Sequence, residues 1–249
     1  MSEERVVTAC VLIIGNEILS GRTQDVNLAH LATELNEHGI QVREARVIPD
    51  DEDEIVTALN ACRARYDYVF TTGGIGPTHD DITAECVAKA LGRSLYSHPE
   101  IEALVRRRDA PPDVMASRMR MALVPDGAEL LTFSFGPGGF VVDDVIVLAG
   151  VPRIMREMLT SVLPKLEGSK PVRSRTVSAY VTETQIAAPL REIQARFEQV
   201  AIGSYPFTHD GKFATSLVVR GTDATLLDSV CDEMEQLLRG VGEVFEPDS

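Results

Sequence analysis

A continuous run of largely β-branched residues near the start constrains the fold more than any other feature of this sequence. It covers residues 6–14, VVTACVLII, and it leaves no polar face that could turn toward water. Such a strand is typical of a parallel sheet whose two faces are both covered. An apolar stripe at helical spacing follows the run, and Gly39 closes that predicted helix.

The same alternation of strand and helix continues over the first 165 residues. Further strands are predicted at three places, residues 41–48, 68–72 and 145–149. Helices are predicted to follow them, at about 55–62, 82–91 and 155–162. The stretch 99–140 is less regular, with helices predicted near 100–107 and 113–121. Repeated strand–helix units favour an α/β fold of three layers around a mostly parallel sheet.

A short polar segment at residues 167–171, with Gly168 and Pro171, indicates a linker between two domains. Beyond it we predict, in order, a strand, a helix, two strands, a helix and a strand, at 175–181, 183–196, 200–205, 213–220, 225–239 and 241–245. This βαββαβ order is that of a small α+β, ferredoxin-like fold. The expected domains are residues 1–167 and 172–249.

Charge excludes some classes of partner. The chain has 38 acidic and 24 basic residues, a net charge of −14, so we expect no nucleic-acid or membrane partner. No apolar run reaches the roughly 20 residues that span a bilayer, and the start lacks the layout of a secretion signal. The four cysteines are scattered without a CxxC pair, which favours reduced thiols and a cytoplasmic location.

The sharpest motif, TTGGIGPTHDDIT at residues 71–83, lies between the end of a predicted strand and the start of a helix. Ligands of open α/β sheets bind at such strand ends. Glycines let the backbone approach a ligand, and a helix N-terminus favours phosphate. The motif is neither a P-loop nor a dinucleotide fingerprint. The glycines alone also fit a tight turn, with Asp81 or Thr83 as a helix cap.

The adjacent acids Asp80 and Asp81 favour a binding site over a plain turn. One carboxylate suffices for a cap, and two beside an anion repel each other unless a cation or a proton intervenes. Magnesium is typically bound by one or two carboxylates together with phosphate oxygens. The motif therefore indicates a divalent metal that bridges carboxylate and phosphate.

Other strand ends carry unusual segments as well. Glu17 follows the first buried strand directly, where a carboxylate is costly unless it has a partner, so it binds either a ligand or backbone N–H groups. After the second strand, Asp51 is predicted to cap a helix, and Asp50 is the better candidate for chemistry. Residues 135–140 are predicted as a glycine-rich loop that exposes its backbone. Pro152 fits the first turn of a helix.

At these residues the chain resembles the molybdopterin-binding, or molybdenum-cofactor-biosynthesis, domain family. Residues 71–83 are similar to the family signature TTGGxGPTxDDxT. Residues 15–27 resemble the GxELLxGxxxDxN segment of one branch, which holds the amino-terminal domain of competence/damage-inducible protein A and the FAD synthase molybdopterin-binding-like domain. The resemblance covers about residues 5–165. The tail, with IGSYP at 202–206, resembles the small domain that follows in FAD-synthase-like members.

The resemblance implies a core that binds a pterin phosphate or a nucleotide. Related proteins adenylylate molybdopterin or insert molybdate. This branch is associated instead with metal-dependent cleavage of the pyrophosphate in ADP-ribose or FAD, stimulated by potassium. We therefore expect a homo-oligomeric nucleotide pyrophosphatase that uses Mg²⁺, Mn²⁺ or Co²⁺, with K⁺. The alternatives are a pterin nucleotidyltransferase or another cofactor-assembly enzyme, and a non-catalytic module that binds a nucleotide or pterin.

The resemblance also implies roles for single residues. Asp50 and Asp81 match the acidic pair that serves catalysis or metal binding in adenylylating relatives. The predicted metal ligands are Glu17, Asp80 and Asp81. Binding of phosphate and substrate is predicted for a larger set: Thr72, Gly73, Gly74, Gly76, Pro77, Thr83, Gly138, Gly139 and Pro152.

The chain departs from the family pattern in places. Asn16 stands where the branch has Thr or Asp, residues 135–140 lack the GTAPGF order, and Ala149 replaces the proline of LPGVP. We therefore expect the non-phosphate end of the ligand to be recognised differently here. The sequence ends at Ser249 without the amidase domain that often follows in the competence-protein branch, so we do not expect nicotinamide-nucleotide deamidation.

Overall fold

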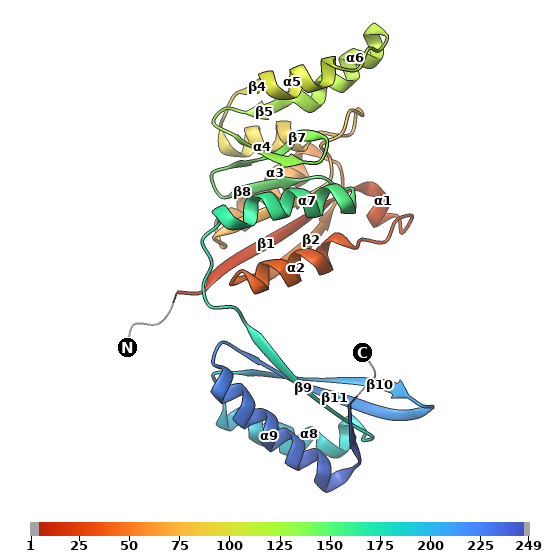
Figure 1. The fold of residues 1–249 in the computed structure, drawn as a ribbon, viewed down its shortest axis with the longest axis vertical. Coiled ribbons are helices and arrows are strands. Elements are labelled where there is room, and N and C mark those ends of the chain that lie inside the picture. The colour runs from red at the N-terminus through yellow and green to blue at the C-terminus, as the bar shows by residue number, and fades with distance from the viewer. Residues whose placement is uncertain (1–4, 247–249) are drawn as a thin grey trace. The chain divides into compact units, whose positions relative to one another are not determined.

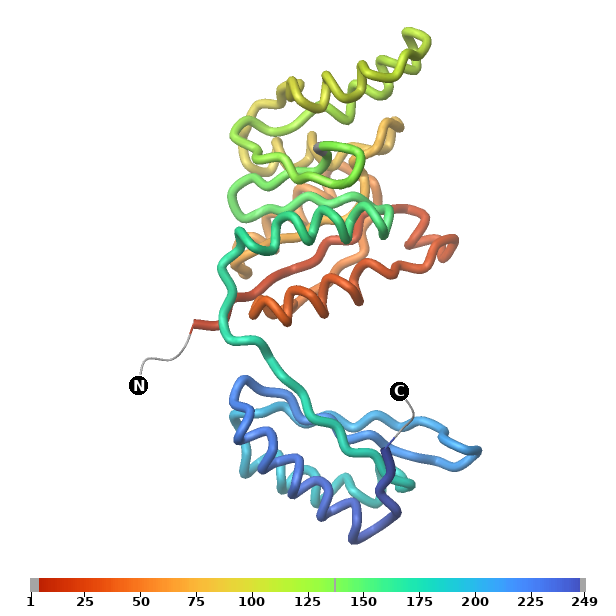
Figure 2. Tube along the Cα trace, in the orientation of Figure 1, coloured from red at the N-terminus to blue at the C-terminus, as the bar shows by residue number. Residues whose placement is uncertain are grey.

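A computed structural model describes residues 5–246 of the chain (Figures 1 and 2). By its internal contacts the chain forms two compact units that divide between Ser169 and Lys170. This division falls inside the polar segment 167–171. Within the described residues, no helix is both long enough and apolar enough to cross a membrane.

The first unit is built on a six-stranded sheet in the order β2-β1-β3-β8-β7-β6. Its strands are β1 (Val7–Ile14), β2 (Ile40–Ile48), β3 (Tyr68–Thr72), β6 (Glu129–Phe133), β7 (Gly136–Val142) and β8 (Val145–Leu148). The pairs β2–β1, β1–β3 and β3–β8 are parallel, whereas β7 pairs antiparallel with both β8 and β6. The predicted α/β fold with a mostly parallel sheet is confirmed.

Helices cover both faces of this sheet, as Figure 1 shows. The covering helices are α2 (Asn27–Glu37) and α7 (Pro152–Val162) on one face, and α3 (Glu52–Arg63) and α4 (Thr83–Leu91) on the other. The unit also contains α1 (Asn16–Leu19), α5 (Pro99–Arg106) and α6 (Pro112–Met119). A two-stranded sheet of β4 (Leu95–Ser97) and β5 (Leu123–Pro125) lies beside α4. The predicted helices near 100–107 and 113–121 correspond to α5 and α6.

Alternate side chains of β1 enter two separate cores. Cys10, Leu12 and Ile14 pack in the core that includes residues of α3 and α4. Ala9, Val11 and Ile13 pack in the core that includes residues of α2 and α7. Because the two sets share one strand, the β-branched run has no exposed face, which explains why it lacks the alternation of a half-buried strand.

The glycine-rich segment 135–140 was predicted as a loop, and this prediction is wrong. Residues from Gly136 form β7, which pairs with β6 and β8. Glycine has a low intrinsic preference for strands, so the local sequence conceals the element. The apolar end of β7, residues 140–142, pairs with residues 145–147 of β8.

The second unit follows the βαββαβ order. Its elements are β9 (Arg173–Ala179), α8 (Glu183–Arg196), β10 (Ala201–His209), β11 (Lys212–Gly221), α9 (Ala224–Val241) and β12 (Val244–Phe245). The strands form an antiparallel sheet in the order β10-β11-β9-β12. Residues of both helices and of the sheet bury a core of their own, and α8 begins with a capping box between Thr182 and Gln185. The predicted α+β domain is confirmed.

The cysteines are free thiols, as predicted. Cys10, Cys62 and Cys86 are buried, and Cys231 is partly buried. Burial raises the pKa of the Cys86 thiol to about 12, which keeps it protonated and unreactive at neutral pH. The sulfur atoms of Cys10 and Cys62 lie 2.8 Å apart inside the core between β1 and α3.

Leu12→Ala tests the role of the central strand. Leu12 is fully buried, so its truncation leaves a cavity in the core and should lower the free energy of unfolding of the first unit by about 2–5 kcal/mol. Denaturant unfolding followed by circular dichroism measures this change. Leu19→Ala, at a side chain that is 52% exposed, is the matched control. Equal losses in the two variants would contradict the two-sided burial of β1.

Candidate functional site

A cavity of about 660 Å³ lies at the carboxyl ends of the parallel strands of the first unit. Ile14 at the end of β1, Asp50 after β2, Gly73 after β3 and Ala149 after β8 all line it. This is the edge of an open α/β sheet at which ligands bind. The volume lies within the range that is typical of pockets for small molecules.

Most of the residues predicted for the site line this one cavity. They are Glu17, Asp50, Gly73, Gly74, Gly76, Asp80, Asp81, Gly138, Gly139 and Pro152. Thr72, Pro77 and Thr83 are absent from the lining. Thr72 and Thr83 are buried instead, in β3 and in the first turn of α4.

Thr83, at the start of α4, fixes the shape of the glycine loop through two hydrogen bonds. Its hydroxyl donates to the carbonyl of Gly73 at 3.0 Å, and its backbone N–H donates to the carbonyl of Gly74 at 3.0 Å. Gly73 has φ +104° and Gly74 has φ +66°. A Cβ on Gly73 would lie 2.2 Å from the carbonyl oxygen of Ile14, and one on Gly74 would lie 2.2 Å from the Thr83 hydroxyl. Only glycine fits these two positions.

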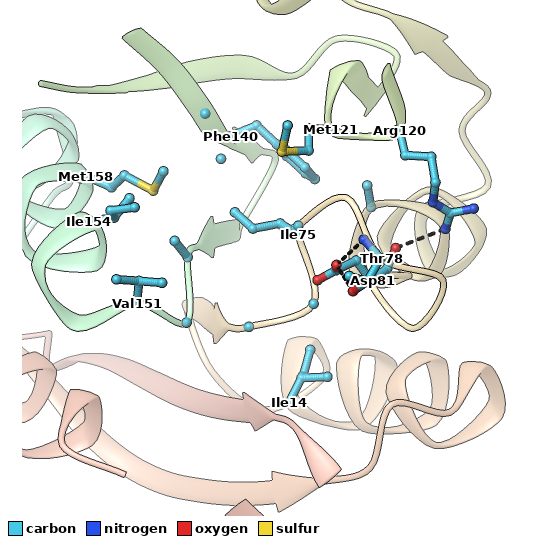
Figure 3. A pocket seen from close by; sticks show the side chains of 18 of the residues that line it. Ile14, Ile75, Thr78, Asp81, Arg120, Met121, Phe140, Val151, Ile154 and Met158 are labelled. Atoms are coloured by element: carbon cyan, nitrogen blue, oxygen red, sulfur yellow. Dashed lines mark hydrogen bonds between the residues drawn. The ribbon is translucent and has the colours of Figure 1, made fainter. Parts of the chain in front are cut away.

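Asp81 closes its own turn rather than capping the helix. Its carboxylate accepts from the Thr78 backbone N–H at 2.7 Å and from the Thr78 hydroxyl at 2.5 Å (Figure 3). Helix α4 starts at Thr83 with Ile82 before it and without a side-chain cap, so neither Asp81 nor Thr83 caps it. Hydrogen bonding within this loop, chiefly at the Thr78 side chain, holds the pKa of the neighbouring Asp80 carboxyl below its usual value.

Asp50 and Glu17 approach the cavity from the first two strand ends. The Asp50 carboxylate accepts from the backbone N–H of Asn16 at 2.8 Å, which ties the end of β2 to α1. Glu17 folds back over Gly15, where a Cβ would lie 2.6 Å from its carboxylate oxygens. Glu17 is exposed, so the expectation that burial forces it to find a partner is wrong. Asp51 caps α3 through the N–H groups of residues 53 and 54, as predicted.

Acidic side chains dominate the polar part of the lining. Glu17, Asp50, Asp80, Asp81 and Glu85 line it, and Arg120 is the single cationic side chain among its described residues. These carboxylates are the hard oxygen donors that Mg²⁺ and Mn²⁺ prefer. Within residues 5–246, however, no group of three His, Cys, Asp or Glu side chains could by itself hold a metal ion. A divalent cation fits this lining if oxygens of a ligand or of water complete its coordination.

The other part of the lining is apolar, and the sequence did not indicate it. Ile154 and Met158 of α7, Phe140 of β7 and Met121 surround it (Figure 3). Both methionines line the cavity, and Met158 is also buried in the core of the first unit. Ile75 of the glycine loop extends toward this apolar part in the same view.

Arg120 supports the acidic part of the cavity, and sequence reasoning missed it. Its Nη2 donates to the backbone carbonyl of Asp81 at 3.1 Å and to the carboxylate of Glu85 at 3.3 Å. Arg120 therefore supports the loop that carries Asp81, although it lies far from that loop in the sequence. No local pattern in residues 113–121 could have revealed this contact.

Gly73→Ala tests the close approach of the loop to β1. The new Cβ would displace the Ile14 carbonyl or the loop itself, and we expect a loss of about 2 kcal/mol or more in the free energy of unfolding. Gly21→Ala is the matched control, because Gly21 also has a positive φ but nothing within 4 Å of its Cβ position. Urea unfolding measures both variants. A loss in Gly73→Ala no larger than in the control would contradict this packing.

Comparison with known proteins assigns each of the two units to a family. Residues 10–168 match the family described as "Probable molybdopterin binding domain". Residues 171–244 match the family described as "FAD synthase, middle domain". The two matches meet at the division between the two compact units.

Individual relatives extend over much of the chain. Protein TK1472 of Thermococcus kodakarensis is 35% identical over 247 residues, which cover 93% of this chain and 96% of the relative. A "Probable FAD synthase" of Caenorhabditis elegans is 29% identical over 94% of this chain, which spans only 50% of that longer protein. A CinA-like protein of Desulfosudis oleivorans is 36% identical over 68% of this chain and 44% of its own length.

A solved structure supports the fold of the first unit. The protein CinA of Thermoplasma acidophilum, of unknown function, superposes with a TM-score of 0.57 at 34% identity, over 64% of this chain and 96% of that one. The chain therefore belongs to the molybdopterin-binding domain family, beside CinA-like proteins, and carries a second domain of the FAD synthase middle type.

Proposed function

We propose that this protein is a metal-dependent hydrolase of a dinucleotide pyrophosphate of the ADP-ribose or FAD type. One observation carries the proposal: the glycine loop and the acidic side chains line the same cavity. Backbone N–H groups of the loop and the N-terminus of α4 suit a phosphate group. The carboxylates of Glu17, Asp50, Asp80 and Asp81 suit a cation beside it.

The charge of the lining supports a cation in the reaction. Acidic side chains outnumber Arg120, so a pyrophosphate entering alone would be repelled. A divalent cation, when bound, would neutralise charge on both the phosphates and the carboxylates. Potassium would add further neutralisation of the same kind.

The protein's own groups have distinct parts in this proposal. The glycine loop holds the pyrophosphate in a fixed position, because Thr83 anchors the carbonyls of Gly73 and Gly74. Asp81 and Asp50 each accept a backbone hydrogen bond that fixes the carboxylate, from Thr78 and Asn16 respectively. Held in this way, either carboxylate can orient a water molecule and accept its proton as the water oxygen bonds to one phosphorus. The bridging P–O bond then breaks, and the other half of the dinucleotide leaves with its own phosphate.

A specific observation also favours a non-catalytic module as the second candidate. Since no three acidic side chains within residues 5–246 gather as a metal site, the cavity could bind a nucleotide or pterin without turning it over. Calorimetry with ADP-ribose would then show binding without release of AMP. A pterin nucleotidyltransferase would instead consume ATP only when molybdopterin is supplied.

The assay for the proposed function combines the full chain with ADP-ribose or FAD, K⁺, and Mg²⁺, Mn²⁺ or Co²⁺ in turn. We expect release of AMP, measured by chromatography, that chelation with EDTA abolishes. A folded sample that binds these ligands and releases no AMP with any of the metals would refute hydrolysis and leave the binding module.

Asp81→Asn should lower the hydrolysis rate by about a hundredfold or more, since the amide cannot accept a proton or neutralise a cation. The amide oxygen can still accept from Thr78, so the loop should keep its shape. Asp53→Asn is the matched control, because Asp53 is 96% exposed and lies outside the cavity lining. Equal rates in the two variants would remove Asp81 from the mechanism.

A further inference from the structure

Two cysteine sulfurs meet inside the core of the first unit. Cys10 lies on β1 and Cys62 in the last turn of α3, and their Sγ atoms are 2.8 Å apart. Both side chains are fully buried. Because a disulfide holds its two sulfurs at about 2.05 Å, this pair needs to approach by less than about 1 Å to be bonded.

The fold itself holds the two thiols together. β1 lies between β2 and β3 in the sheet, and Cys10 shares one core with residues of α3. Leu59, about one turn before Cys62, is buried in that same core. Side chains in a protein core are close-packed, which leaves the thiols little room to move apart. Their proximity is therefore set by the strand and the helix, and not by a mobile surface segment.

A buried pair of thiols suits either a metal ion or a disulfide. A structural zinc ion takes four protein ligands, and within residues 5–246 no group of three His, Cys, Asp or Glu side chains could hold a metal. Cys86 lies on α4, and Cys231 lies on α9 in the second unit. The geometry of the pair therefore favours a bond between Cys10 and Cys62.

We propose that Cys10 and Cys62 form an oxidation site, at which a small disulfide such as oxidised glutathione converts the two thiols into an internal disulfide. One cysteine thiolate attacks the oxidant, expels a glutathione thiolate and keeps the other glutathione as a mixed disulfide. The second cysteine thiolate then attacks the protein sulfur of that mixed disulfide and expels the second glutathione. The two cysteines lose two electrons and two protons, and these convert the oxidant into two glutathione thiols.

Burial decides when this reaction occurs. Loss of hydration in the core raises the pKa of the Cys10 thiol, and the thiolate is the form that attacks a disulfide. A glutathione molecule also has no access to side chains that are fully buried. The mixed disulfide therefore forms while the first unit is unfolded, and folding brings the second sulfur to it. Once the core has closed, the same burial protects the bond from reductants.

The bond would stabilise the part of the chain that carries the acidic side of the cavity. It would join residues 52 positions apart and enclose α1, α2 and β2, together with Glu17 and Asp50. Such a cross-link stabilises mainly by restricting the unfolded chain. Neither sulfur lines the cavity, so this proposal does not depend on the reaction proposed above.

The test refolds the full, reduced chain from urea in a buffer of reduced and oxidised glutathione. We expect mass spectrometry of unreduced peptides to show a link between residues 10 and 62, and thiol titration in denaturant to find Cys86 and Cys231 free. The melting temperature of the first unit should be about 5 °C or more above that of the same sample reduced in denaturant and refolded with dithiothreitol. The chain that is already folded should acquire the link at least about tenfold more slowly.

Two variants control for the loss of a buried side chain. Cys62→Ala should lose both the link and the rise in melting temperature. Cys86→Ala, the matched control, removes a thiol from the same core and should keep both. Each variant is compared with its own reduced form, so the cost of the cavity cancels. If a cavity prevents a variant from folding, the linkage and the thiol titration of the unchanged chain decide the result.

Four outcomes would overturn the proposal. The first is a refolded, native chain that still titrates four thiols. The second is a link that includes Cys86 or Cys231 in place of the pair. The third is a link between residues 10 and 62 that leaves the melting temperature unchanged or lowers it, which would mean that the core does not accommodate the bond. Equal rates of linkage in the folded and the refolding chain would refute the route through folding.

Discussion

Burial of β1 on both faces is the constraint on which the rest of the first unit depends. Its alternate residues belong to two cores, so the chain must place helices on each side of the sheet. The neighbouring strands β2 and β3 run parallel to it, and each connection must return to the starting edge. The strands consequently end at one edge, and the cavity lies there.

Features set by a few consecutive residues could be predicted from the sequence. The strand run, Asp51 as the cap of α3 and Pro152 in the first turn of α7 all match the structure. In each case the signal and the structure that it specifies lie within one or two turns, so tertiary contacts do not override the local preference.

Features set by distant contacts could not be predicted in this way. Strand β7 depends on pairing with β6 and β8, which compensates for its glycines. The sequence predicts that Thr83 binds phosphate, yet its hydroxyl donates its hydrogen bond to the carbonyl of Gly73. Arg120 and Met121 enter the cavity only because η1 (Arg120–Ala122) lies against the loop of Asp81. Residue type and spacing along the chain contain no information about these contacts between distant segments.

The anchoring of the glycine loop by Thr83 has a consequence for how relatives can diverge. The same hydrogen bonds shape the loop and secure the first turn of α4, so a substitution there would harm folding and ligand affinity together. Phe140 and Met158 at the apolar end of the cavity are also buried in the cores, but side chains of similar volume can replace one another in apolar surroundings at small cost. New ligand preferences should therefore evolve at that end, while the loop stays nearly invariant.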